Sequence, residues 1–246
     1  VWELCNDKLK NGDLSARKLI EVSNVDVICT TDDPVDSLEW HKKIKEDNFS
    51  VRVLPTWRPD KALHIEKDSF SDYLHTLSAV SGVEIKDFDS LIEALKIRMD
   101  FFVENGCKVS DHGLEYIMYE NYTDNEVNEI LKKKLNGNQL SETEQRKYKT
   151  AFMVAMGKEY AKKNLVMQLH YGVIRDLNKR IFNTLGADAG IDAVNNYSSS
   201  VETGRYLNAL AEENLLPKTI IYPLNSSDFD AVGTIIGCFQ DSDTIG

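Results

Sequence analysis

The apolar run at residues 165–169 constrains the fold of this chain more than any other stretch. Four of its five residues are apolar, which is too short a run for a stand-alone helix and suits a strand that is buried on both faces. Strands of that kind occur in parallel sheets that are covered by helices. A polar residue, His170, follows this run, and we expect a new helix to begin near Val173. Because ligands bind at the carboxyl ends of such strands, His170 is a candidate functional residue.

Further strands are predicted at 25–30, 50–55, 107–110 and 219–223, and helical patterns separate them. Helix starts are predicted at Pro34, Ser69 and Asp87 and at the capping boxes of Thr123 and Ser141. Such alternation indicates parallel strands joined by right-handed crossovers. Nearly every strand ends in polar residues, which favours a (β/α)8 barrel over an open sheet, because all barrel strands open onto one mouth. The sequence therefore predicts an α/β fold, with residues 1–246 in a single domain.

The charge balance restricts the partners of the chain. Its 246 residues include 29 basic and 40 acidic side chains, a net charge of −11, which disfavours binding to nucleic acid or to an anionic membrane surface. A small anionic substrate stays compatible if a few arginines are focused in one cleft. No signal peptide is recognisable and no apolar run approaches the roughly 20 residues of a membrane span, so we expect a cytoplasmic protein. The four cysteines form no CxxC pair, and Cys29 and Cys107 are expected to be small core residues.

The segment that follows the strand at 50–55 contains Trp57, Arg58 and Asp60. An arginine at a strand end, stiffened by a following proline, is suited to a bidentate pair with a carboxylate or a phosphate. The alternative is a structural ion pair between Arg58 and Asp60 or Asp32. The residues alone leave both interpretations open.

Asp111 and His112 follow the strand at 107–110 and have two interpretations. The carboxylate can orient an imidazole, and a histidine with an ordinary pKa of about 6.5 works as an acid or a base near neutral pH. The alternative for Asp111 is a helix N-cap. Similarly, His170 and Arg175 flank a predicted strand-to-helix turn, where the alternative is a core histidine and a surface arginine.

Several motifs of known chemistry are absent from the sequence. It contains no HxH, HExxH or paired CxxC motif, so we expect no complete metal site in this chain. It also lacks a GxGxxG phosphate-binding loop and a GxSxG nucleophile elbow.

Taken together and in order, seven sequence strings resemble the uronate isomerase (glucuronate isomerase) family of the amidohydrolase superfamily. The strings are CTTDDP at 29–34, PTWRPDK at 55–61, SDHG at 110–113, QLHYG at 168–172 with Arg175, LGADAG at 185–190, KTIIY at 218–222 with LN at 224–225, and GCFQD at 237–241.

The resemblance implies a distorted (β/α)8 barrel with extra helices between its strands, of which this chain would hold roughly strands two to six. The HxH pair of the family's first strand and the aspartate of its eighth strand have no counterpart here. We therefore expect an internal fragment, an incomplete barrel domain that is inactive by itself, whereas the full-length protein should be active and use a divalent metal, Zn²⁺. His170 would be at most a neighbour of that metal.

The resemblance also implies a reaction. Uronate isomerases of carbohydrate metabolism interconvert D-glucuronate with D-fructuronate and D-galacturonate with D-tagaturonate, by proton transfer through an enediol. Catalytic roles would then fall to His170, Asp111 and His112, and substrate binding to Arg58, Trp57, Asp60 and Arg175, with Arg58 on the carboxylate of the hexuronate. A homo-oligomer is expected.

Two other functions compete with this reading. A metal-dependent amidohydrolase would need a lysine or further histidines at the strand ends, where this chain has Asp111, His112 and Asn225. A non-catalytic protein that binds sugar acids would need none of the missing metal ligands.

Overall fold

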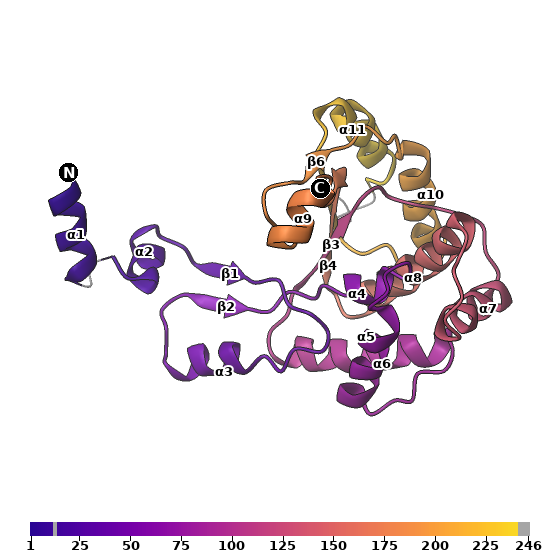
Figure 1. Cartoon of the computed structure of the whole chain (residues 1–246), viewed down its shortest axis with the longest axis horizontal. Coiled ribbons are helices and arrows are strands. Elements are labelled where there is room, and N and C mark those ends of the chain that lie inside the picture. The colour runs from indigo at the N-terminus through magenta and orange to yellow at the C-terminus, as the bar shows by residue number, and fades with distance from the viewer. Residues whose placement is uncertain (12–13, 241–246) are drawn as a thin grey trace.

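Five parallel strands in sequence order form the framework of the computed structural model, which describes residues 1–11 and 14–240 (Figure 1). The strands β1 (Val27–Cys29) and β2 (Arg52–Leu54) pair with each other, and β4 (Val166–Tyr171) lies between β3 (Val109–Leu114) and β7 (Thr219–Pro223). Isolated parallel bridges at Trp57, to Asp32 on one side and to Ser110 on the other, connect the two groups of strands. The predicted alternation of helices with parallel strands is confirmed.

Helices connect consecutive strands, as in other parallel α/β folds. Those of the first half are α1 (Trp2–Lys10), α2 (Ala16–Val22), α3 (Glu39–Glu46), α4 (Asp60–Leu63), α5 (Phe70–Ser81) and α6 (Phe88–Glu104). Those of the second half are α7 (Asp124–Leu135), α8 (Glu142–Lys162), α9 (Lys179–Leu185), α10 (Ser200–Ala211), the 3-10 turn η1 (Ser226–Asp228) and α11 (Phe229–Cys238). In Figure 1, α1 and α2 extend away from the body of the molecule, and no described residue of either helix is buried.

The capping signals placed four helix starts correctly, at Ser69, Asp87, Thr123 and Ser141. The side chains of Asp87, Thr123 and Ser141 each accept a hydrogen bond from the backbone N–H three residues later, and the backbone N–H of the cap donates to the side chain at that position. Such a cap contributes about 1 kcal/mol to the stability of its helix.

The core lies between the sheet and the helices, and α8 contributes much of it. Met167 and Leu169 of β4 are fully buried, and so are Phe152 and Met156 of α8, which packs against β4. Along β4 the side chains alternate, so Gln168 and the half-exposed His170 lie on the opposite face. One face of the sheet is therefore covered by helices, whereas the other is open.

Two predicted helix starts were wrong. Pro34 does not begin a helix, because residues 33–36 form a turn in which the Asp36 N–H donates to the carbonyl of Asp33, and α3 begins only at Glu39. No helix begins near Val173. Instead β4 continues through His170, and the chain then enters the short strand β5 (Val173–Ile174), which pairs antiparallel with β6 (Ala193–Val194).

The strand at 107–110 was placed too early, because β3 runs to Leu114 and contains Asp111 and His112. Cys107 is buried as predicted, but Cys29 is exposed, so its assignment to the core was wrong.

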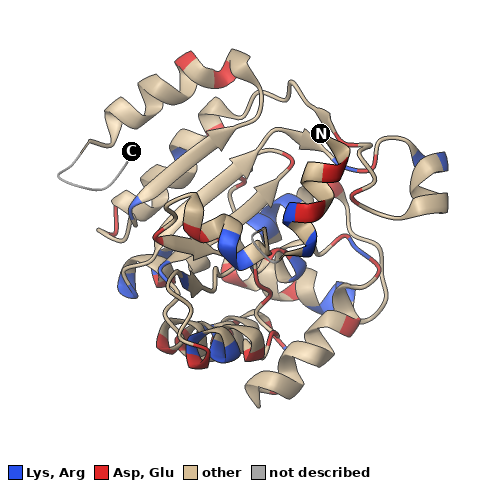
Figure 2. Ribbon diagram, turned by 90° about the vertical axis from the view of Figure 1, so that its left-hand side faces the viewer, with Lys and Arg blue, Asp and Glu red and all other residues tan. Residues whose placement is uncertain are grey.

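Charged side chains lie mostly on the helices and connecting segments, whereas the strands are almost free of them (Figure 2). Within the described residues, every helix is too short or too polar to cross a lipid bilayer.

Candidate active site

A cavity of about 480 Å³ lies at the carboxyl ends of β3, β4 and β7. Its polar lining comes from five segments of the sequence and consists of Arg58, Asp111, His170, Arg175, Asp192 and Tyr222. Polar side chains at the carboxyl ends of several strands therefore meet in this cavity, and ligands of parallel α/β folds bind at that edge of the sheet.

The alternation of side chains along β3 separates the two candidates that are adjacent in sequence. Asp111 lines the cavity, whereas His112 points the other way, is fully buried and contacts Tyr160 of α8. His112 consequently cannot touch a ligand in this cavity, and its predicted part in catalysis can only be indirect.

Arg58 is held by two carboxylates at the edge of the cavity. Its Nε donates to Asp60 Oδ2 at 3.1 Å, and its Nη1 lies 3.4 Å from Asp111 Oδ2. The guanidinium lies directly over Gly113, where a Cβ would be only 2.2 Å from Arg58 Nη2. The proposed structural pair between Arg58 and Asp60 is thus present, but the arginine side chain keeps 30% of its surface exposed and still lines the cavity.

Behind Arg58, Asp60 contacts His112 and Gly113 of β3 as well as the arginine itself. Its Oδ1 lies 2.9 Å from His112 Nδ1, and its Oδ2 also accepts the backbone N–H of Gly113 at 2.8 Å. Burial alone would raise the pKa of this carboxyl. The hydrogen bonds from His112 and Gly113 and the charge of Arg58 outweigh burial and lower the pKa to about 2. Asp60 is therefore an ionised anchor for Arg58 at neutral pH.

His170 projects into the cavity and is half-exposed. Its Nε2 lies 3.2 Å from Asp111 Oδ1, and its ring stacks on Tyr222 with centroids 4.2 Å apart and an interplanar angle of 3°. The stacking follows from the sheet register, which places His170 opposite Tyr222. The Tyr222 hydroxyl donates to Gln168 Oε1 at 3.1 Å and fixes the tyrosine ring. An imidazole held in this way, with a carboxylate beside it, can exchange protons with a bound ligand.

Arg175 lies near Gly113 of β3 and is held by Asp192. Its Nη1 lies 2.6 Å from Asp192 Oδ2, whereas Asp188 is 3.9 Å away and largely exposed. Asp192 also accepts the backbone N–H of Asp176, and together these contacts lower its pKa. A smaller hollow of about 430 Å³ shares Arg58, Gly113 and Arg175 with the main cavity.

Trp57 lies behind the cavity and does not line it. Its side chain is fully buried and packs edge-on against Phe102 of α6, with ring centroids 5.1 Å apart. The buried ring packs behind the segment that carries Arg58 and Asp60, and a contact of Trp57 with substrate stays a prediction from the sequence.

The sequence reasoning missed three residues of this site. Asp192 and Tyr222 are separated from their partners Arg175 and His170 by 17 and 52 residues, and Tyr160 lies inside a long apolar helix face. Polar residues follow the predicted strand at 219–223, but no local pattern in the sequence indicates which side chains of that strand face the cavity.

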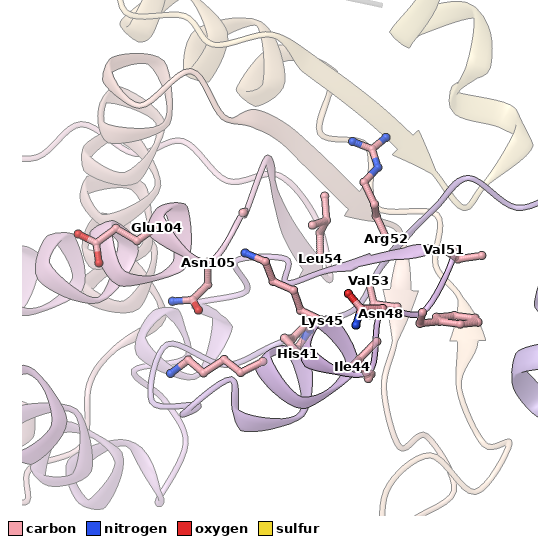
Figure 3. Close-up of a pocket in the computed structure, with 13 residues that line it drawn as sticks. His41, Ile44, Lys45, Asn48, Val51, Arg52, Val53, Leu54, Glu104 and Asn105 are labelled. Atoms are coloured by element: carbon pink, nitrogen blue, oxygen red, sulfur yellow. The ribbon is translucent and has the colours of Figure 1, made fainter.

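Figure 3 shows a second cavity of about 500 Å³, between α3, β2 and the C-terminal end of α6. His41, Lys45 and Arg52 line it, together with apolar side chains such as Ile44 and Leu54. The imidazole of His41 lies 3.7 Å from the carboxylate of Asp32, but Asp32 does not line this cavity. The first cavity is lined by both Asp111 and His170 and is therefore the better candidate for an active site.

The residues of the described part of the chain do not make a metal site on their own. Among residues 1–11 and 14–240, no group of three or more histidine, cysteine, aspartate or glutamate side chains is arranged to hold an ion. His170 and Asp111 offer two donors and Asp111 is also engaged by Arg58. The expectation of no complete metal site in this chain stays a prediction from the sequence.

Comparisons with known proteins agree on one family. The chain is 57% identical to a uronate isomerase of Lachnospira eligens and 55% identical to one of Lachnoclostridium phytofermentans, covering 100% of this chain and 53% of each relative. A crystal structure of a uronate isomerase from Thermotoga maritima matches with a TM-score of 0.90 and 32% identity, over 97% of this chain and 52% of that one. The chain thus spans about half the length of the curated relatives it matches. The family model for glucuronate isomerase matches residues 1–246, and this chain therefore belongs to the glucuronate isomerase family.

Proposed function

We propose that this chain supplies the hexuronate-binding wall of a uronate isomerase, an enzyme that interconverts an aldose and a ketose. Because the chain spans about half of its relatives, the reaction is proposed for the full-length protein. One observation carries the proposal: a guanidinium fixed between two carboxylates faces the same cavity as a half-exposed histidine. A uronate needs both groups, since its carboxylate is remote from the carbons that react.

Arg58 would anchor the substrate carboxylate. Its Nε donates to Asp60 and its Nη1 faces Asp111, so Nη2 would form the charge-assisted hydrogen bonds with the ligand. Arg175 lines the same cavity and adds positive charge, which attracts an anion despite the overall charge of −11.

His170 and Asp111 would lie at the reacting end of the sugar. Isomerisation requires a proton to leave C2, an enediol to be stabilised and a proton to return to C1. The Nε2 of His170 faces Asp111 Oδ1, so this pair would take up the proton and return it. Asp60 and His112 would act behind Arg58 and touch no substrate.

The full-length protein is proposed to form a (β/α)8 barrel in a single domain, of which this chain would hold about five strands. Five parallel strands in sequence order support that architecture. A divalent metal, Zn²⁺, is proposed for the full-length enzyme, where it would polarise sugar oxygens. A homo-oligomer and a cytoplasmic location remain predictions from the sequence.

Turnover of D-glucuronate by the full-length protein, with added Zn²⁺, tests the proposal. The full-length Arg58→Met variant and the 246-residue chain are assayed alongside. We expect ketose from the wild type alone, and uronate binding by Arg58→Met that is weaker but still measurable by calorimetry. Binding without conversion by the wild type would favour a sugar-acid binding protein. Hydrolysis of an amide or ester instead would favour an amidohydrolase, and neither binding nor conversion would refute the substrate assignment.

A further inference from the structure

A buried line of hydrogen bonds connects helix α8 with Arg58. The hydroxyl of Tyr160 lies 2.9 Å from His112 Nε2, and His112 Nδ1 lies 2.9 Å from Asp60 Oδ1. The other oxygen of Asp60 accepts from Arg58 Nε at 3.1 Å. Tyr160 and His112 are fully buried, so water cannot replace either partner of this line.

The direction of each hydrogen bond follows from the groups at the two ends. Asp60 is an ionised carboxylate and only accepts, so His112 must donate from Nδ1. Burial raises the pKa of Tyr160 well above its ordinary value, so the phenol keeps its proton and can donate it to the ring nitrogen that faces it, Nε2 of His112. With that direction of donation, the line holds the tautomer of His112 that has its proton on Nδ1.

That tautomer decides how Asp60 faces Arg58. With Nδ1–H on Oδ1 and the Gly113 N–H on Oδ2, both carboxylate oxygens are fixed, and Oδ2 is aimed at Arg58 Nε. The other tautomer would place the lone pair of Nδ1 against Oδ1, which repels it and lets the carboxylate turn. The orientation of the guanidinium therefore depends on a hydroxyl that does not reach the cavity.

We propose that Tyr160 is a positioning residue, which holds Arg58 in its ligand-binding orientation through His112 and Asp60. This inference rests on the proposed role of Arg58 as the anchor of the substrate carboxylate. It assigns a function to a side chain of α8 that lines neither of the two cavities beside Arg58.

The full-length Tyr160→Phe variant tests the proposal, because it deletes the hydroxyl and leaves the ring in place. Since one hydrogen bond is removed, we expect the KM for D-glucuronate to rise about three- to tenfold, with kcat changed less than twofold. Tyr206→Phe is the matched control, because Tyr206 is also a buried phenol but its hydroxyl donates to the carbonyl of Met153. The control should retain the wild-type KM.

A double-mutant cycle separates positioning from packing. If Tyr160 acts through Arg58, then Tyr160→Phe has no further effect on uronate binding in an Arg58→Met background. A separate readout is the ring tautomer of His112, measured by ¹⁵N NMR of histidine-labelled protein with the signal assigned by its loss in His112→Asn. We expect the Nδ1–H form in the wild type and a mixture in Tyr160→Phe.

An unchanged KM in a folded Tyr160→Phe variant would overturn the proposal, and so would equal effects in the wild-type and Arg58→Met backgrounds. A lower melting temperature with unchanged KM would also overturn it, since that result assigns Tyr160 to packing alone. Failure of the wild type to bind uronate refutes the proposed function instead, and the NMR tautomer would still report whether the buried line exists.

Discussion

Replacement of Gly113 by alanine should impair substrate binding without destabilising the protein. An alanine Cβ would lie 2.2 Å from Arg58 Nη2 and 3.4 Å from Arg58 Cζ. Ordinary contact between such atoms needs about 3.5 Å, so the guanidinium must move by more than about 1 Å. The backbone of Gly113 lies in β3 without a positive φ, so alanine itself fits the strand.

The magnitude follows from the contacts that the displacement breaks. Hydrogen bonds to charged groups contribute about 1.5–3 kcal/mol. Loss of the contact between Arg58 and the carboxylate of the substrate should therefore raise the KM for D-glucuronate roughly 10- to 100-fold. The far end of the arginine side chain moves easily, and a compatible Gly→Ala change removes freedom from the unfolded chain and stabilises by about 0.4–1 kcal/mol. The melting temperature should therefore stay within about 2 °C of the wild type, or rise.

The assay combines steady-state isomerisation by the full-length protein with thermal unfolding of the same samples. Gly204→Ala is the matched control, because Gly204 lies in α10 without a positive φ and its added Cβ would meet no atom within 4 Å. That variant should keep the wild-type KM and be slightly more stable. A wild-type KM in Gly113→Ala would refute the anchor role of Arg58. A large loss of stability would refute the argument that only the guanidinium has to move.

Three further predictions follow from the same site. The pKa of Asp60 is lowered to about 2, so its ionised form stabilises the folded protein by about 2 kcal/mol. This contribution is fully present above about pH 4 and disappears as the pH falls toward 2. The gap in unfolding free energy between wild type and Asp60→Asn should therefore be constant above pH 5 and narrow below pH 4 in acid unfolding; a gap that widens there would contradict the assignment. His170→Asn should lower kcat about 10²- to 10⁴-fold with a smaller change in KM, whereas a pure KM effect would exclude His170 from proton transfer. Asp192→Asn should release Arg175 and raise KM about two- to fivefold by calorimetric or kinetic measurement, and an unchanged KM would make Arg175 a structural residue.

Local patterns in the sequence determined the strands, most helix starts and the parallel α/β class. Capping boxes act through residues three apart, and a buried strand is marked by its own apolar run, so both can be predicted from a short window. The two wrong helix predictions, at Pro34 and Val173, share a cause. In each segment a local signal favours a helix, but a turn at 33–36 or the pairing of β5 with β6 determines the backbone instead.

The sequence also predicted four polar side chains that the structure brings to one cavity. Arg58, Asp111, His170 and Arg175 were chosen because they follow predicted strands, and all four line one cavity. Parallel strands bring their carboxyl ends to one edge, which makes this inference independent of the register.

Only the tertiary structure decided which of these side chains face a ligand. Asp111 and His112 are adjacent in the chain, yet the pleat of β3 sends one to the cavity and the other to Tyr160. Likewise, the stacking of His170 on Tyr222 depends on the register of β4 with β7. A shift of one residue would reverse every such assignment, and register is set by long-range packing that no short window of sequence contains.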